Sequence, residues 1–440
     1  MGFSKKAASG KTAAAEPRQK AVKPIKVDKA TAKANKAAAK ANKASAKNTK
    51  SKNKISGRSF VAIEIEEATI RCVEVSGGSK RTFSKFYEHE IDRGIVSDGD
   101  VVDVDALTEI LQNIWKEQKY SSREVHIVIN SDKAEISYQT MDDEKDFAKA
   151  FVHRVPEGAF NVQDYYLGFH NLALYEQDIK DTSTVEGYRT VAKRDVLLVG
   201  LRRSDVDHVL DAFKKAKLYP LSLDVAPLAM LRAAPTMSLD NAIDVHINVN
   251  SEAMIIVISH KNQPQFVRNL SHHGGSAIRR RIMEEMGADD QYARELAAKS
   301  VEMNPSDLLR ARKDSEPSVF GIDEAPRYSE DQIKAYQVVQ SEIADMIESV
   351  NVTVTFFTDR NSSGLGDRFG KFVLSGDTPV LESLRQRIQH ETSLAVELAT
   401  PLDYQRSIGA SFSDESVNTI KQEAFTVTLG AAVATGKAQD

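Results

Sequence analysis

Two stretches of the chain repeat one pattern of apolar and polar positions. Residues 60–75 and residues 247–258 each hold two segments rich in aliphatic and β-branched residues, separated by a short polar turn. Such runs favour β-strands, and a short polar interruption between them favours a hairpin. Each stretch therefore predicts a β-hairpin, and the two hairpins open two halves of one folded body.

Similar elements follow each hairpin. In the first half, a helix is predicted behind the capping residues 103–105, and a buried strand over residues 124–130. The apolar face of that helix consists of Leu107, Ile110, Leu111, Ile114 and Trp115. The second half is predicted to continue with a strand over 265–270, helices over 277–286, 288–300, 330–357 and 378–392, strands over 372–375 and 395–398, and a closing helix over 424–434. The repeated order of strands and helices predicts a duplicated α/β fold.

A separate small unit is predicted between the two halves, over residues 137–219. Residues 164–175 and 195–201 read as strands, joined by a polar hairpin loop or insertion over 181–194. A helix is predicted over residues 204–216, with Ser204 as its N-cap.

The first 56 residues differ in composition from the rest. They are rich in alanine and lysine and have almost no aromatic or branched apolar residues, so they cannot bury enough surface to offset their ordering entropy. The predicted domains are a disordered basic tail (1–56), a first half (57–136, with a return over 220–240), the inserted domain (137–219), and a second half (241–440) with a helical subdomain over 281–370.

The net charge of −4 conceals a strong asymmetry. Residues 1–54 hold 16 lysines and arginines against two acidic residues, which leaves 43 basic and 61 acidic residues, a charge of −18, for the body. The tail is either a solvated tether or an electrostatic contact to anionic lipid or nucleic acid. Few aromatic residues are available there for base stacking.

Several function classes receive no support from the sequence. No apolar run approaches the ~18–20 residues that span a bilayer, and the N-terminus lacks the apolar core of a secretory signal. Cys72 is the only cysteine, so an intramolecular disulfide is excluded, which fits a reducing cytoplasm. His272 and His273 lack an acidic partner one helical turn away, and the acidic loop at 98–105 lacks calcium-loop spacing, so no metal site is predicted. With neither a phosphate-binding P-loop nor a nucleophile elbow, no catalytic residue is predicted.

Three segments and a glycine pair carry a resemblance to a known family. They are the opening hairpin 61–75, the strand and helix from Val196 that lead to Asp224-Val225, the segment from Val373 through Gly376 to Leu384, and Gly274-Gly275. In these segments the body, over residues 58–436, resembles the type IV pilus assembly protein PilM, a relative of the cell-division protein FtsA. The resemblance implies an α/β, actin-like (ribonuclease H-like) two-half fold with a small inserted domain and a nucleotide site between the halves.

The chain departs from the family where that site is expected. Glu64 replaces the aspartate of the first loop, Glu66 its glycine, and Arg71 its lysine. Asn248 and Asn250 replace the aspartate and glycine of the second loop. The resemblance places the expected cofactor-binding site at Glu64, Glu66, Thr69, Arg71, Asn248, Asn250, Ser251, Gly275, Gly376 and Asp377, where Asp377 stands in place of a second glycine. Because several positions of one pocket have changed together, we expect binding of ATP and Mg²⁺ to be lost or weak.

The resemblance also implies a role. We expect a cytoplasmic scaffold or adaptor of a type IV pilus-like machine, peripheral to the inner membrane through a partner. That partner would be a PilN-like inner-membrane platform protein, whose short cytoplasmic peptide binds a groove between the inserted domain and the first half. A homo-oligomer or ring is an open option. The alternatives are an FtsA-like ATPase that polymerises at the membrane and a sugar-kinase-like enzyme, for which no catalytic carboxylate can be placed.

Overall fold

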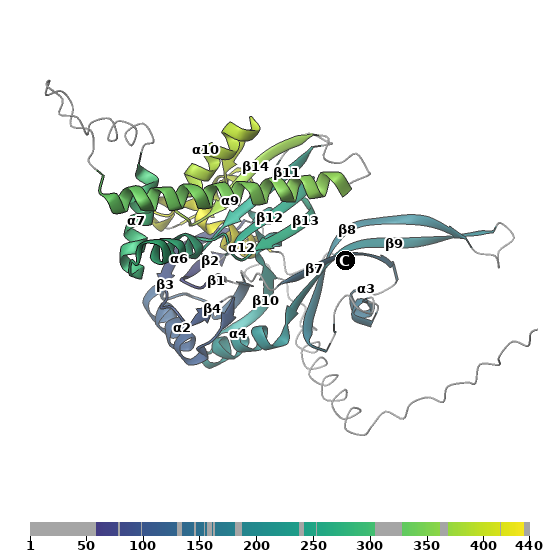
Figure 1. Ribbon diagram of the computed structural model, residues 1–440. Helices are drawn as coiled ribbons and strands as arrows, with labels where there is room; N and C mark the ends of the chain where they lie inside the picture. Colours follow the sequence, from purple (N-terminus) through teal and green to yellow (C-terminus); the bar gives the residue numbers. More distant parts are fainter. Residues whose placement is uncertain are drawn as a thin grey trace, which may run out of the picture. The chain divides into compact units, whose positions relative to one another are not determined.

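A computed structural model describes residues 59–434, except 78–79, 98, 130–133, 145–146, 154, 156–160, 162, 181–186, 237–241, 252, 304–327, 361–367 and 414 (Figure 1). The predicted basic tail lies outside the described residues. So do residues 304–327 and 361–367 of the predicted helical subdomain and residue 98 of the acidic loop.

The first sheet has the strand order β10-β6-β1-β2-β3-β16. Its strands are β1 (Phe60–Ile65), β2 (Thr69–Ser76), β3 (Thr82–Glu90), β6 (Glu124–Ile129), β10 (Tyr219–Val225) and β16 (Ser411–Phe412). β1, β2 and β3 pair antiparallel, whereas β6 pairs parallel to β1 and β10 parallel to β6. Every residue of β1 is buried, because both faces of the sheet are covered.

The second sheet repeats this plan with the order β13-β12-β11-β14-β15. Its strands are β11 (Ile243–Val249), β12 (Met254–His260), β13 (Gln263–Leu270), β14 (Phe369–Gly376) and β15 (Val396–Leu398). Three antiparallel strands are again followed by two parallel ones. The duplicated α/β fold predicted from the two hairpins is therefore confirmed.

Helices cover the sheets in layers (Figure 1). α2 (Val104–Gln118) and α4 (Arg203–Lys215) pack apolar residues against one side of β1. Asp103 caps α2 as predicted, since its side chain accepts hydrogen bonds from the backbone N–H groups of residues 105 and 106. The second sheet packs against α6 (Gly275–Met286), α7 (Asp290–Glu302), α9 (Glu330–Arg360) and α10 (Leu381–Thr392).

Two short helices lie between the sheets. α5 (Ala226–Ala233) and α12 (Thr426–Val433) share one apolar core with Ala62 of β1 and Ile255 of β12. Their backbones approach so closely that a Cβ at Gly430 would overlap the carbonyl of Ala229. The remaining short elements are β4 (Val96–Ser97), β5 (Asp100–Val101), α11 (Pro401–Ser407), η2 (Glu415–Asn418) and η3 (Gln422–Phe425).

The inserted unit is a three-stranded sheet in the order β7-β9-β8. Its elements are β7 (Glu135–Asp142), α3 (Phe147–Ala150), η1 (Phe151–His153), β8 (Tyr165–Lys180) and β9 (Tyr188–Arg202). α4 joins two cores: Phe213 packs under the first sheet, and Val206 packs beside Val199 of β9.

Two local predictions in this unit were wrong. Residues 188–194, expected to belong to a polar loop, continue β9 and pair with β8 as far as Lys180 opposite Tyr188. Because most of this ribbon is exposed, no apolar alternation marked it as strand. The N-cap of α4 is Arg202, and Ser204 instead donates its hydroxyl to Asp205.

The contact between α5 and α12 gives a stability prediction. Gly430→Ala should lower the free energy of unfolding by about 1–3 kcal/mol or more, because the added methyl group forces the two helices apart. The control is Gly168→Ala, an exposed position in β8 where a Cβ meets nothing within 4 Å. Urea denaturation of both variants checks this, and equal midpoints would contradict the close approach.

The buried His246 gives a pH prediction. Burial lowers the pKa of His246 to about 4, and its Nε2 lies 3.1 Å from the hydroxyl of Ser259. Below a pH of about 6.5, His246 becomes protonated in the unfolded chain but stays neutral in the folded chain. The free energy of unfolding therefore falls as pH falls. When the pH is lowered from 7 to 5, the unfolding free energy of both proteins is measured. The decrease should be about 2 kcal/mol smaller for His246→Gln than for the native chain. The exposed His208→Gln is the matched control in the same urea titrations.

Candidate functional site

A buried arginine forms the centre of the candidate site. Only 2% of the Arg71 side chain is exposed, although it carries a full charge. Its Nε donates to Glu88 at 2.7 Å, Nη1 lies 3.2 Å from a carboxylate oxygen of Glu66, and Nη2 donates to Asp377. One guanidinium thus binds three carboxylates from three different segments of the chain.

The register of the first sheet explains most of this cluster. Arg71 on β2 lies opposite Glu64 of β1 and opposite Glu88 of β3. The turn between β1 and β2 is closed by the N–H of Glu66, which donates to the carbonyl of Thr69 at 2.9 Å. Two hairpins therefore place three acidic residues around one arginine.

Asp377 reaches the cluster from the second sheet. It follows Gly376, the last residue of β14, which has a φ of +121° and pairs with Val249 of β11. A Cβ at Gly376 would overlap the backbone of Val249, so only glycine fits there. The glycine brings the two strands together and directs the next residue towards the first sheet.

Glu64 lies beneath this cluster and is fully buried. Burial raises the pKa of Glu64, although Arg71 and a hydrogen bond of 2.5 Å from the hydroxyl of Thr428 on α12 oppose the shift. Burial alone would lower the pKa of Arg71, but Glu66, Asp377 and the other carboxylates raise it well above its ordinary value. Arg71 is therefore a permanent cation among acidic groups.

The second-loop residues form a neighbouring group. The side-chain oxygen of Asn250 accepts from the N–H of Ala253 at 2.8 Å and closes the turn between β11 and β12. Asn248 donates to the hydroxyl of Ser375 on β14 at 3.0 Å. The first backbone N–H groups of α6, at Gly275 and Ser276, donate to the carbonyls of residues 250 and 251.

Three buried oxygens in this second group have no hydrogen-bond partner among the described residues. They are Oδ1 of Asn248, Oγ of Ser251 and Oγ1 of Thr378. A Cβ at Gly275 would lie 3.8 Å from both Thr378 Oγ1 and the Cα of Ser251, so two of the three segments meet at the start of α6.

The structure thus brings the ten predicted positions together in two adjoining groups. Glu64, Glu66, Thr69 and Arg71 lie on the first hairpin, and the others lie at the ends of β11 and β14 and at the start of α6. Sequence reasoning missed Glu88, Thr428 and Thr378. The register of the β2–β3 hairpin would have revealed Glu88, whereas Thr428 is brought close only by the tertiary fold.

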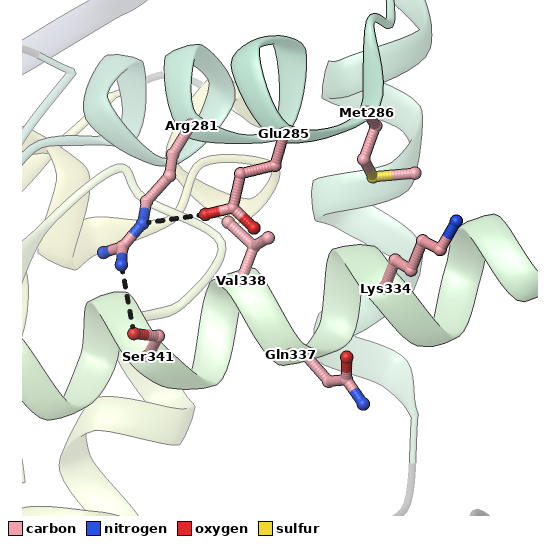
Figure 2. A pocket seen from close by; sticks show the side chains of 7 residues that line it. All are labelled: Arg281, Glu285, Met286, Lys334, Gln337, Val338 and Ser341. Atoms are coloured by element: carbon pink, nitrogen blue, oxygen red, sulfur yellow. Dashed lines mark hydrogen bonds and ion pairs between the residues drawn. The ribbon is translucent and has the colours of Figure 1, made fainter.

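A separate pocket of about 260 Å³ lies between α6 and α9 (Figure 2). Its lining consists of Arg281, Glu285, Met286, Lys334, Gln337, Val338 and Ser341, so no predicted site residue belongs to it. Arg281 donates to Glu285, Glu342, Asp345 and Ser341. The charge of Arg281 is therefore balanced by acidic neighbours.

Comparisons with known proteins support the fold. No protein-family model matches the chain, and no curated protein matches it. A chain of the PilM–PilN type IV pilus biogenesis complex superposes with a TM-score of 0.62, over 85% of this chain and 97% of that chain, at 17% identity. At that identity the likeness establishes the fold alone: the chain has the actin-like fold, as predicted.

Two further solved structures are less similar. The ethanolamine utilization protein EutJ from Carboxydothermus hydrogenoformans gives a TM-score of 0.44 at 12% identity, over 87% of this chain and 91% of that chain. MreB5 of Spiroplasma citri bound to ADP gives 0.46 at 8% identity, over 86% of this chain and 95% of that chain. We draw nothing from scores this low. Within the described part of the chain, no helix is both long enough and apolar enough to cross a membrane.

The cluster around Arg71 gives a prediction on stability. Arg71→Met should lower the unfolding free energy by about 3–5 kcal/mol, because it removes the cation beside the buried carboxylates of Glu64 and Glu66. Those carboxylates then have raised pKa values, so the stability they contribute is present at low pH and is lost as pH rises. The loss should therefore be smaller at pH 5 than at pH 7 in urea denaturation.

Two further variants control this experiment. Arg71→Met combined with Glu66→Gln should lose less stability than Arg71→Met alone, since it also removes one of the buried negative charges that Arg71 neutralises. Lys371→Met breaks only the exposed pair with Glu397 and should cost about 0–1 kcal/mol. If Arg71→Met costs no more than Lys371→Met, the cluster does not stabilise the fold.

Proposed function

We propose that this protein is a PilM-like cytoplasmic scaffold of a type IV pilus-like machine and that it works without ATP. The observation that carries the proposal is the ion cluster of Arg71. This cluster occupies the first-loop hairpin and the glycine loop after β14, the positions where the resemblance places the nucleotide.

The charges of the cluster oppose a polyphosphate. Arg71 already binds the carboxylates of Glu66, Glu88 and Asp377. A phosphate placed ~4 Å from one of the carboxylates would be repelled by about 4 kcal/mol in a partly screened site. Binding would also have to break ion pairs that are already formed.

The second group offers little to a phosphate or its metal. The first N–H groups of α6 would ordinarily suit an anion, but those of Gly275 and Ser276 already donate to backbone carbonyls. Asn248 provides an amide where a carboxylate would direct Mg²⁺. Among the described residues, no three carboxylate, histidine or cysteine side chains are grouped to hold a metal ion.

One observation favours the alternative of an FtsA-like ATPase that polymerises at the membrane. Asn248, Ser251 and Thr378 have oxygens without a partner among the described residues, and two of them, Ser251 and Thr378, meet at the start of α6, where a ligand would satisfy them. A weakly bound nucleotide would use this group rather than the cluster of Arg71.

The proposed partner is a PilN-like inner-membrane protein. One support is the likeness in fold to a chain of the PilM–PilN complex. The other is that the elements that would form the peptide groove carry exposed apolar residues. Tyr219 and Leu221 on the edge strand β10 are 61% and 50% exposed, and Tyr138 and Tyr166 are exposed on the inserted sheet. An unpaired edge strand beside apolar side chains suits an extended peptide.

Such a partner would keep the protein at the inner membrane. The basic tail would add an attraction to anionic lipid of about 1 kcal/mol per cation near the surface. Nucleic acid is the other anion that the tail could attract, and a ring of several copies would give the scaffold several docking points.

Calorimetric titration of the full chain with Mg²⁺ and ATP tests the proposal. No binding in the micromolar range is expected, at a salt concentration that screens the basic tail. Tripolyphosphate serves as the control, because it binds the tail as ATP does but has no adenosine. Micromolar binding of ATP alone, with nucleotide-dependent pelleting, would support the FtsA-like ATPase instead.

A paired variant tests the physical reason. Replacing both carboxylates by glycine, in Glu66→Gly with Asp377→Gly, removes two of the charges that repel phosphate. If these charges exclude the nucleotide, ATP affinity should rise by roughly tenfold or more, the factor expected for a change of about 1.4 kcal/mol. Unchanged affinity in a folded variant would show that something else decides binding.

A further inference from the structure

One ion pair joins the two sheets at the candidate site. Arg71 belongs to β2 of the first sheet, whereas Asp377 follows β14 of the second sheet. The guanidinium is 2% exposed and the carboxylate 22% exposed, so salt screens this pair only weakly.

A second ion pair joins the two halves at another place. Arg93, in the loop between β3 and β4 of the first half, lies 2.5 Å from Asp290 at the start of α7. Asp290 is also 3.2 Å from both Arg279 of α6 and Arg294 of α7. One carboxylate of the second half is thus surrounded by three arginines, one of which comes from the first half.

The inserted sheet also touches the second half. Nε2 of His170 on β8 lies 2.9 Å from Oε1 of Gln263, the first residue of β13. Together with the helices α5 and α12, these contacts connect the two halves of the folded body.

We propose that the ion pairs Arg71–Asp377 and Arg93–Asp290 hold the two halves closed permanently, as a built-in latch in place of a bound ligand. Arg71 keeps Glu66 and Glu88 when the halves part, but Asp377 would lose the only cation that it contacts among the described residues. Opening also separates Arg93 from Asp290, so it breaks a charged pair at each of two places. The protein would therefore present one fixed arrangement of its outer surfaces to a partner.

The distance between two spin labels on the full chain tests the latch. Asn113→Cys on α2 and His390→Cys on α10 place one label on each half, at exposed positions without recorded side-chain contacts. The native Cys72 is fully buried and burial raises its thiol pKa, so labelling is confined to the introduced cysteines. The native latch should give one narrow distance distribution without nucleotide.

Opening the latch should change that distribution. Asp377→Asn with Arg93→Gln removes one charge from each pair without changing side-chain size greatly, and it should add a second, longer distance. The population of the longer distance should rise by roughly tenfold or more, the factor expected when a charged hydrogen bond is lost. Glu88→Gln is the matched control, since it removes a partner of Arg71 within the first half and should leave the distance unchanged.

Three results would overturn the latch. They are two distances in the native chain without nucleotide, an unchanged distribution in the double variant, and equal broadening in Glu88→Gln. Arg93→Gln alone is a surface change that does not threaten folding, and it should broaden the distribution partially. Because the measurement needs no nucleotide, its failure is distinguishable from a failure of the proposed function in the ATP titration.

Discussion

The structure depends on where the charge of Arg71 is neutralised. A fully buried guanidinium is stable only when acceptors surround it, and here they come from the first turn, from β3 and from the loop after β14. That requirement ties the opening hairpin to the far end of the chain. It also places carboxylates in the region where an actin-like fold ordinarily presents glycines and amides to phosphate. One arrangement of charges thus links stability, the contact between the halves and the proposed loss of ATP use.

The scaffold around the cluster remains an ordinary member of its fold class. Two sheets of the same strand order enclose α5 and α12, and glycine is kept at the two places where backbones approach most closely, Gly376 and Gly430. The backbone of the actin-like fold is therefore present, while Arg71 at the candidate site binds Glu66, Glu88 and Asp377. Fold alone does not settle function, so the proposal of a scaffold that works without ATP rests on the side chains at this site.

Much of the fold could be predicted from local patterns. Alternating and continuous apolar runs identified the two opening hairpins, and helical spacing identified α2, α7, α9 and α10 within a few residues. Strands were predicted over 164–175 and 195–201, but the outer part of the β8–β9 ribbon, residues 176–180 and 188–194, was missed because its exposed faces carry no apolar period. All ten expected site positions lie in two adjoining groups, which follows from the doubled hairpins. The side-chain contacts that these residues make with one another could not be predicted from such local patterns.

The sequence by itself determined the duplicated α/β plan and the replacement of loop glycines by Glu66, Asn250 and Asp377. These depend on residue type and short spacing. Because side chains alternate between the two faces of a strand with a period of two, the sequence also indicates which side chains share a face. Only the tertiary structure decided that Arg71 meets Asp377 and that Thr428 meets Glu64. Those contacts join segments more than 300 positions apart, and no local preference encodes them. They exist because two sheets pack about α5 and α12, and buried charges must then find partners in whatever segment the packing brings near.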